Sequence, residues 1–299
     1  MDHMTSSTLL ILYCTLIFLA SLAGGLIPLF VRLTHTRLQV AISFVASFML
    51  GIGLLHLLPH AWHKLRSIDQ AVLWLVGGFV VMFFIQRFFH FHHHDVPDEA
   101  PEQANAKEGS EGHTHDHCNH DHANETPTEL TLAQRSAKNL SWGGAALGLT
   151  LHTLIDGFAV AASIEVEAHE PGHGFWLGLG TFLVVILHKP FDAMAIGTLM
   201  ALRGSSRMSR HLANGILALA IPMGAALFHF GALQAGGAST VFVGSVLAFA
   251  AGSFLCIAAS DLLPELQFHS HDRIKLSIAL LLGLGLAWLI GIFETSGHG

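Results

Sequence analysis

The 299-residue chain is 52% hydrophobic and 12% charged, with a mean hydropathy of +0.55, which excludes a protein whose whole surface faces water. Its formal charge of −7 carries little weight, because the acidic residues fall mainly between apolar runs, and we expect no nucleic-acid partner. Cys14, Cys118 and Cys256 form no Cys-x-x-Cys pair, which speaks against a disulfide framework or a thiolate zinc site. The 23 histidines point instead to metals or protons.

Eight apolar stretches each have the roughly 20 residues that a helix needs to cross a bilayer. They cover residues 8–31, 39–60, 71–91, 141–164, 174–202, 211–233, 239–263 and 275–293. We therefore predict an all-α polytopic membrane protein with eight transmembrane helices.

The distribution of lysine and arginine predicts the orientation of the spans, because cytoplasmic loops carry an excess of these residues. The loops after odd-numbered spans hold Arg32, Arg37, Arg87, Lys107, Arg135, Lys138, Arg203, Arg207, Arg210, Arg273 and Lys275, and those after even-numbered spans hold Lys64 and Arg66. The odd loops are predicted to be cytoplasmic. We thus expect an integral protein of the plasma or inner membrane with both termini extracytoplasmic.

A polar segment, residues 92–139, separates helices 1–3 (residues 1–91) from helices 4–8 (residues 140–299). It lacks the apolar residues needed for a core and is predicted to be a disordered cytoplasmic loop. Close-set neutral imidazoles chelate metal, so a buffering or sensing role is favoured over that of a passive linker. The loop chelators are His113, His115, His117, His120 and His122.

Two similar sequence motifs suggest an internal repeat. His56-Leu-Leu-Pro-His60 closes the second span and Asp261-Leu-Leu-Pro-Glu265 closes the seventh, at opposite faces of the predicted membrane. An inverted repeat of spans 1–3 and 6–8 around spans 4–5 would produce this relation. The alternative is two unrelated helix ends, each stopped by a proline.

Ionisable groups inside a membrane span are costly, so each is a functional candidate. Span four reads His152-Thr-Leu-Ile-Asp156 and span five reads His188-Lys-Pro-Phe-Asp192. The spacing of four puts imidazole and carboxylate on one helix face, a turn apart. Two nitrogen and two oxygen donors suit a tetrahedral zinc ion, and the absence of thiolate favours an ion that can be released. The alternative is that each pair is only an interhelical hydrogen-bond clasp.

These features resemble the ZIP (Zrt/Irt-like) family of divalent metal transporters over essentially the whole chain. They are the eight spans with outside termini, the His-rich loop, the two His-x-x-x-Asp words and Asp-Leu-Leu-Pro-Glu in span seven. The resemblance implies that His152, Asp156, His188 and Asp192 line the transport site. It also implies uptake into the cytoplasm, a homodimer, and an elevator-like shift of spans 1, 4, 5 and 6 against the rest.

Two residues depart from the pattern of this family and speak against a two-metal centre. Thr153 stands where asparagine is common, and Lys189 where some members carry a second-site ligand. Lys189, three residues before Asp192, reaches that carboxylate or Asp156 if it faces inward. The site is then expected to hold one ion, with the ammonium in place of a second cation. The alternative is that Lys189 extends to the membrane interface.

Other polar residues are weaker candidates. His56 and His60 suit an entrance, or are ordinary helix-end residues. An exit route would use Asp261, Glu265, His269 and His271. Glu165, Glu167 and His169 are assigned to the loop between spans four and five, as a solvated acidic loop or a metal-collecting mouth.

Two other functions use the same ligands. A membrane-embedded zinc hydrolase would need an additional acid or base beside the ion, and no His-Glu-x-x-His word is present. A metal exporter differs only in direction. We therefore expect transport, no enzymatic activity and no catalytic cofactor, with Zn²⁺ as the transported ion and Fe²⁺, Mn²⁺ and Cd²⁺ as alternatives. We expect the lipid bilayer to surround the eight helices.

Overall fold

The computed structural model describes residues 2–25, 35–89, 142–169, 176–202, 204–234, 239–268 and 273–295. In this part of the chain every regular element is helical. The elements are α1 (Asp2–Gly24), α3 (His35–Ile52), η1 (Gly53–Leu57), α4 (Leu58–Leu65), α5 (Ile68–Phe89), α7 (Trp142–Ala168), α8 (Leu179–Leu202), α9 (Arg207–Gln234), α10 (Thr240–Phe268) and α11 (Arg273–Thr295). Eight stretches are long and apolar enough to cross a membrane, which confirms the predicted fold class. The inverted repeat stays a prediction.

The second span continues past residue 60, where the sequence predicted its end. α3 passes through η1, a π-helical turn, into α4, which ends at Leu65 where Arg66 has a left-handed backbone with φ of 56°. Pro59 lies in the first turn of α4, where a missing backbone N–H is tolerated. The helix therefore extends five residues beyond the predicted end of the span and begins four residues before its predicted start.

The fourth and fifth spans also differ from the predicted bounds. α7 continues to Ala168 instead of ending at 164, and α8 begins at Leu179 instead of 174. Pro190 lies inside α8 without ending it. The loop between these spans therefore lies four to five residues later in the chain than predicted, and Glu165 and Glu167, which the sequence assigned to it, belong to α7.

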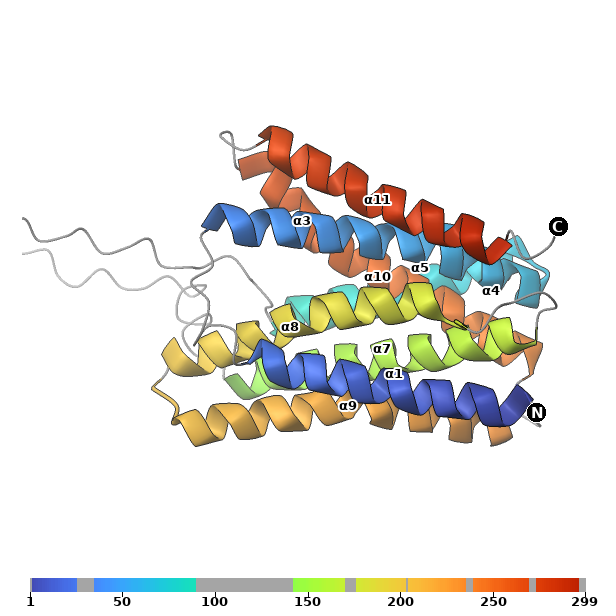
Figure 1. The fold of residues 1–299 in the computed structure, drawn as a ribbon, viewed down its shortest axis with the longest axis horizontal. Coiled ribbons are helices and arrows are strands. Elements are labelled where there is room, and N and C mark those ends of the chain that lie inside the picture. The colour runs from blue at the N-terminus through green and yellow to red at the C-terminus, as the bar shows by residue number, and fades with distance from the viewer. Residues whose placement is uncertain are drawn as a thin grey trace, which may run out of the picture. The chain divides into compact units, whose positions relative to one another are not determined.

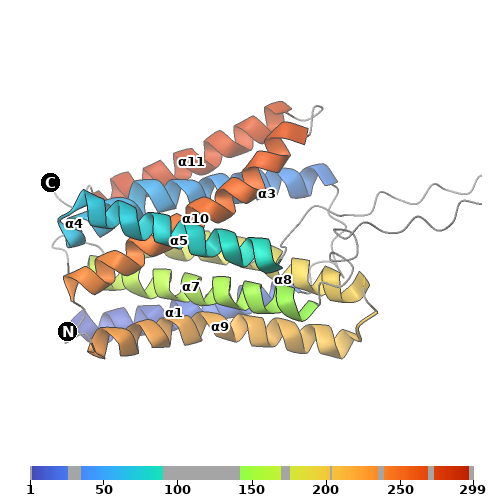
Figure 2. The same cartoon turned by 180° about the vertical axis from the view of Figure 1, so that it is seen from behind.

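The helices form two groups (Figures 1 and 2). In the first group α7 packs on α9 and α1 packs on α8 and α9. In the second, α11 packs on α3, and α10 packs on α5, α4 and α3. Figure 2 shows α10 running obliquely across the second group. These groups correspond to spans 1, 4, 5, 6 and spans 2, 3, 7, 8.

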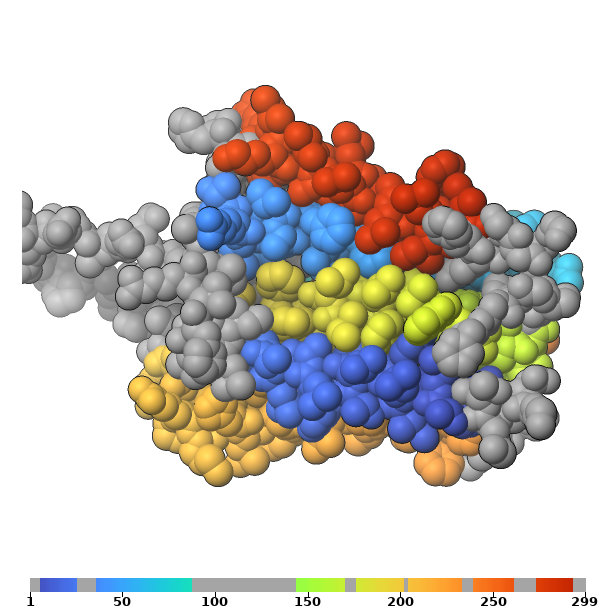
Figure 3. All heavy atoms as spheres, in the orientation of Figure 1, coloured from blue at the N-terminus to red at the C-terminus, as the bar shows by residue number. Residues whose placement is uncertain are grey.

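Two helices of the first group make its contacts with the second. α8 packs against α3, and α7 packs against α10 and α5. Figure 3 shows α8 filling the strip between α1 and α3. Burial is greatest in α7, where 72% of the most apolar window is enclosed, compared with 17% in α5. The two helices with the His-x-x-x-Asp words thus lie between the rest of the first group and the second.

A close glycine contact sets the position of α7 against α9. A Cβ on Gly157 would overlap the carbonyl oxygen of Ile221, and one on Gly224 would overlap the carbonyl oxygen of Leu154. Small residues allow this approach where lipid supplies no hydrophobic force between helices. Because Gly157 directly follows Asp156, this contact also sets how close Asp156 lies to α9 and its position along the axis of that helix.

Candidate metal centre

The four predicted ligands converge between α7 and α8. His152 and Asp156 lie one turn apart on α7, and His188 and Asp192 lie one turn apart on α8. Their exposed fractions are between 0 and 7%. One potential ligand atom from each residue lies within 4.8 Å of those of the other three. The convergence that the sequence predicted is therefore present.

The separations between donor atoms match the edges of a metal coordination shell. His188 Nε2 lies 3.3 Å from Asp156 Oδ2 and 3.9 Å from Asp192 Oδ2. His152 Nε2 lies 3.4 and 3.5 Å from the same two oxygens. Ligands at tetrahedral zinc bond lengths are roughly 3.3 to 3.4 Å apart, since the edge of a tetrahedron is about 1.6 times its centre-to-vertex distance. Three of the four separations are close to this value and the fourth is longer, so the imidazole and carboxylate groups themselves need only small shifts to surround one ion.

The ring of His188 is oriented by a second hydrogen bond. Its Nδ1 lies 2.9 Å from the carbonyl oxygen of Val184, and because a carbonyl only accepts, Nδ1 is the donor. A neutral ring then presents the lone pair of Nε2 toward Asp156 Oδ2. Two lone pairs that face each other favour a cation between them, and such an outer hydrogen bond is usual for metal-binding histidines.

Lys189 occupies the cationic position between the two carboxylates. Its Nζ lies 2.5 Å from Asp156 Oδ2 and 2.6 Å from Asp192 Oδ2, and it donates a hydrogen bond to Thr153 Oγ1 at 3.2 Å. Thr153 in turn donates to the carbonyl oxygen of Leu149. Lys189 is fully buried, so it faces the site instead of extending to the membrane interface. The ammonium contacts both carboxylates, whereas the sequence predicted contact with one.

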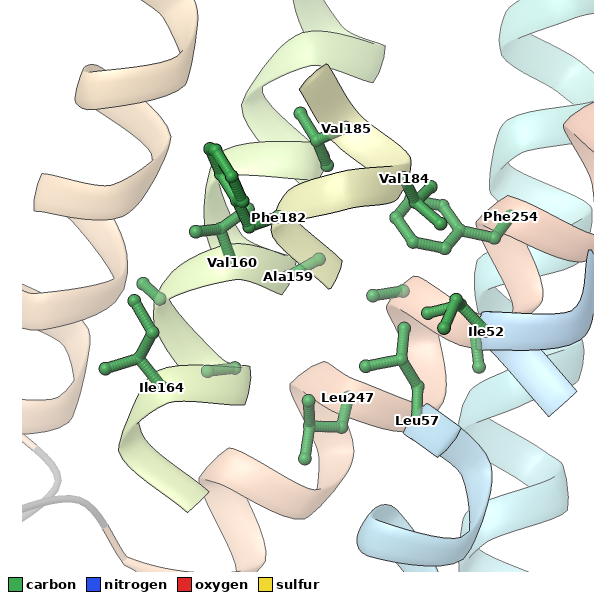
Figure 4. Packing of buried hydrophobic residues seen from close by; sticks show 14 of the residues in the cluster. Ile52, Leu57, Ala159, Val160, Ile164, Phe182, Val184, Val185, Leu247 and Phe254 are labelled. Carbon is green, nitrogen blue, oxygen red and sulfur yellow. The ribbon is translucent and has the colours of Figure 1, made fainter. Parts of the chain in front are cut away.

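The two ends of this centre differ in their surroundings. On the side of η1, apolar side chains of α7, α8, α10 and the second span fill the space (Figure 4). They include Val160, Ile164, Val184, Leu57 and Phe254, all buried. On the other side, a cavity of about 140 Å³ begins at Ala193, next to Asp192, and is lined by Arg207, Arg210 and Asn214.

A second group of potential ligands lies at the end of α7 and η1. Its members are His56, His60 and Glu167, whose candidate ligand atoms are within 4.8 Å of one another. The assignment of Glu165 and Glu167 to a solvated loop is wrong, because α7 continues through both, and Glu167 is only 1% exposed. The sequence did contain a signal that places Glu167 on the same helix face as Asp156. At about 100° per residue, His152, Asp156, Ser163 and Glu167 fall within an arc of roughly 60° on α7.

Several other predicted positions lie outside the described residues. Asp261 and Glu265 belong to the backbone of α10, but their side chains are not described, and His269 and His271 fall in a gap. The domain boundaries at 91/92 and 139/140 and the loop chelators also fall outside. His229, on α9, is exposed and remote in sequence from both groups of ligands. Cys14 and Cys256 are both buried, and in the described part of the chain neither belongs to a disulfide.

Comparison with known proteins gives one consistent result. The sequence profile described as ZIP Zinc transporter matches residues 7–291. Zinc transporter ZIP9 of Xenopus tropicalis is 24% identical over 327 aligned positions, covering 95% of this chain and 97% of that protein. Zinc transporter ZIP13 of Mus musculus is 26% identical over 268 positions, covering 85% and 69% respectively. Zinc transporter zipt-7.2 of Caenorhabditis elegans is 28% identical over 145 positions, covering 48% and 30%.

Proposed function

Because the chain belongs to the ZIP zinc transporter family, we propose that it takes up zinc into the cytoplasm through His152, Asp156, His188 and Asp192. Family membership makes it a membrane metal-ion transporter and not a hydrolase. The path, the direction and the identity of the ion belong to the proposal. The bounds of the two membrane parts, 1–91 and 140–299, are part of the same proposal.

The convergence of four buried donors is the observation that carries the proposed path. Two imidazoles and two carboxylates from adjacent spans lie within 4.8 Å of one another. An uncompensated charge at this depth is strongly unfavourable, so a buried anionic set of this kind favours a bound cation. Nitrogen and oxygen donors without thiolate suit zinc, and they also permit release.

An exchange between lysine and metal would make the site reversible. In the arrangement described, the Lys189 ammonium neutralises part of the charge of two carboxylates. An arriving divalent ion would take Oδ2 of Asp156 and Asp192 as ligands and displace Nζ toward Thr153. When the ion leaves, the ammonium returns, so the empty site avoids two unpaired buried carboxylates. The lysine thus lowers affinity to a level compatible with transport.

The different ends of the site support inward release. Buried apolar side chains, Val160 and Val184 among them, lie on the η1 side of the centre, whereas on the other side a cavity is lined by Ala193, the residue that follows Asp192. Arg207 and Arg210 line that cavity, and the excess of such residues predicts that this end is cytoplasmic. The described state would then be open toward the cytoplasm, and movement of the first helix group against the second would open the opposite end.

Proteoliposome flux with purified full-length protein tests this proposal. Vesicles of known protein sidedness, loaded with a zinc indicator, should take up Zn²⁺ in the wild type. Asp156→Asn and His188→Ala should each lower flux at least tenfold, because one of four ligands is lost. His229→Ala is the matched control, since it removes a histidine from a span without touching the site. Normal flux in Asp156→Asn would exclude the proposed path.

The same vesicles address direction and selectivity. Faster Zn²⁺ movement toward the cytoplasmic face, at equal and opposite gradients, supports uptake, and faster movement away from it supports the exporter. Competition of Fe²⁺, Mn²⁺ and Cd²⁺ with Zn²⁺ ranks the alternatives.

A further inference from the structure

The cluster of His56, His60 and Glu167 joins the two helix groups. His56 Nε2 lies 3.2 Å from Glu167 Oε1, and the rings of His56 and His60 meet edge to face with centroids 4.7 Å apart. His56 lies on η1 and His60 on α4, both in the second group, whereas Glu167 lies on α7 in the first. The two helix groups are therefore linked here by metal-binding residue types.

The carboxylate of Glu167 is held in a fixed orientation. Its Oε2 accepts a hydrogen bond of 2.8 Å from the backbone N–H of Gly178, and Ser163 Oγ donates to Oε1 at 3.5 Å. Gly178 has a φ of +68°, a conformation that favours glycine, and a Cβ there would press on the side chain of Ile164. Oε2 is thus occupied by the backbone, and Oε1 is directed toward His56.

A π-helical turn presents His56. Leu58 N bonds to Gly53 O across η1, which widens the helix by one residue between the transmembrane part and α4. Such turns are rare and frequently occur at functional sites. His56 is 2% exposed, whereas His60 is only partly buried, so the cluster is enclosed by protein on one side and accessible from the other.

The cluster is separate from the centre at His152 and Asp156. Glu167 lies 11 residues beyond Asp156 on the same helix, a rise of about 16 Å. Val160 and Ile164, which belong to the buried apolar cluster (Figure 4), lie between Asp156 and Glu167 along α7. One ion cannot contact both sets of ligands.

We propose that His56, His60 and Glu167 form a second site for a divalent transition metal, which holds the two helix groups together in the described arrangement. Two imidazoles and one carboxylate supply three ligands, and the accessible side near His60 leaves the fourth position to water, as in exchangeable zinc sites. The ion adds bonds from α7 to η1 and α4, so its binding stabilises this packing. The inference does not depend on the transport role proposed above.

The alternative is a metal-free clasp in which His56 and Glu167 share only a hydrogen bond. Both versions predict that the residues contribute to stability. Only the metal site predicts saturable binding that depends on all three residues and is independent of the central ligands.

The test uses full-length protein in which competing sites are substituted. The nine histidines between positions 90 and 122 are changed to serine, and His152→Ala with His188→Ala removes the central imidazoles while keeping Lys189 paired with both carboxylates. We expect this protein to bind one equivalent of Co²⁺, measured by visible absorption and metal analysis, and to unfold at a higher temperature when Co²⁺ or Zn²⁺ is added.

Adding Glu167→Gln should abolish the bound equivalent and the thermal shift. His60→Ala, at a partly exposed position, should weaken Co²⁺ binding at least tenfold. This variant provides the test if Glu167→Gln does not fold. Glu165→Gln on α7 and His63→Ala on α4 are the matched controls and should change neither readout. Absence of saturable binding before these changes, or binding unaffected by both Glu167→Gln and His60→Ala, would overturn the proposal.

Discussion

Lys189 and Asp156 form an ion pair across the interface between α7 and α8, with Nζ 2.5 Å from Oδ2 and both side chains fully buried. The same oxygen lies 3.3 Å from His188 Nε2. The ammonium and a metal bound by His188 would therefore use the same carboxylate atom. Under the proposed exchange, the state of this one pair would distinguish the empty site from the loaded one.

Lys189→Met should destabilise the metal-free protein and strengthen zinc binding. Removal of the ammonium leaves two buried carboxylates unpaired, a loss of about 3–5 kcal/mol for a broken buried pair. Zinc would then restore more stability than in the wild type. Thermal unfolding with a chelator and with saturating Zn²⁺ measures both effects. Lys275→Met, at an exposed position on α11, is the control. Equal unfolding midpoints without metal in Lys189→Met and wild type would contradict the pairing.

Lys189→Asp should convert the central site from one ion to two. The ammonium that repels a second cation is replaced by an additional oxygen ligand. Metal analysis is made in protein with the loop histidines changed to serine and with Glu167→Gln, so that only the central site is counted. We expect one bound equivalent of Zn²⁺ in the protein that keeps Lys189 and two in the Lys189→Asp variant. Two equivalents with Lys189 intact would show that its charge does not limit the stoichiometry.

Gly224→Ala should weaken metal binding although Gly224 touches no ligand. A Cβ there would overlap the carbonyl oxygen of Leu154, so α7 must move and carry Asp156 with it. Such overpacking typically costs about 1–3 kcal/mol. Zinc affinity and the unfolding midpoint should both fall. Gly215→Ala on the same helix meets no atom within 4 Å and should leave both unchanged. If the two variants behave alike, the close approach of α7 and α9 does not position the site.

Deletion of residues 98–126 should leave zinc flux largely intact. All four central ligands belong to α7 and α8, and none comes from this segment. The regulation of flux by cytoplasmic metal should change if the loop histidines buffer or sense the ion. Flux in proteoliposomes, with zinc binding at the central site as a check of folding, measures this. Complete loss of flux in a deletion that still binds zinc would make the segment part of the path.

The sequence by itself determined the spans and the two His-x-x-x-Asp pairs. A transmembrane helix satisfies its backbone hydrogen bonds within one segment, so eight apolar runs suffice to predict eight helices. The spacing of four between His152 and Asp156 is likewise local, because any helix brings such residues to one face. Helix ends were less predictable. The second span was predicted to end at residue 60, but the helix continues through the π-helical turn and Pro59 to Leu65.

Only the tertiary structure decided which helix faces meet. His56 and Glu167 are 111 residues apart, and their contact depends on how the two helix groups are rotated against each other. Packing between helices also decided the contacts of Lys189. Its spacing allowed contact with Asp192, but contact with Asp156 required α7 and α8 to approach closely with these faces together. Helical periodicity assigns a side chain to a face of its own helix, and packing between helices assigns that face a partner.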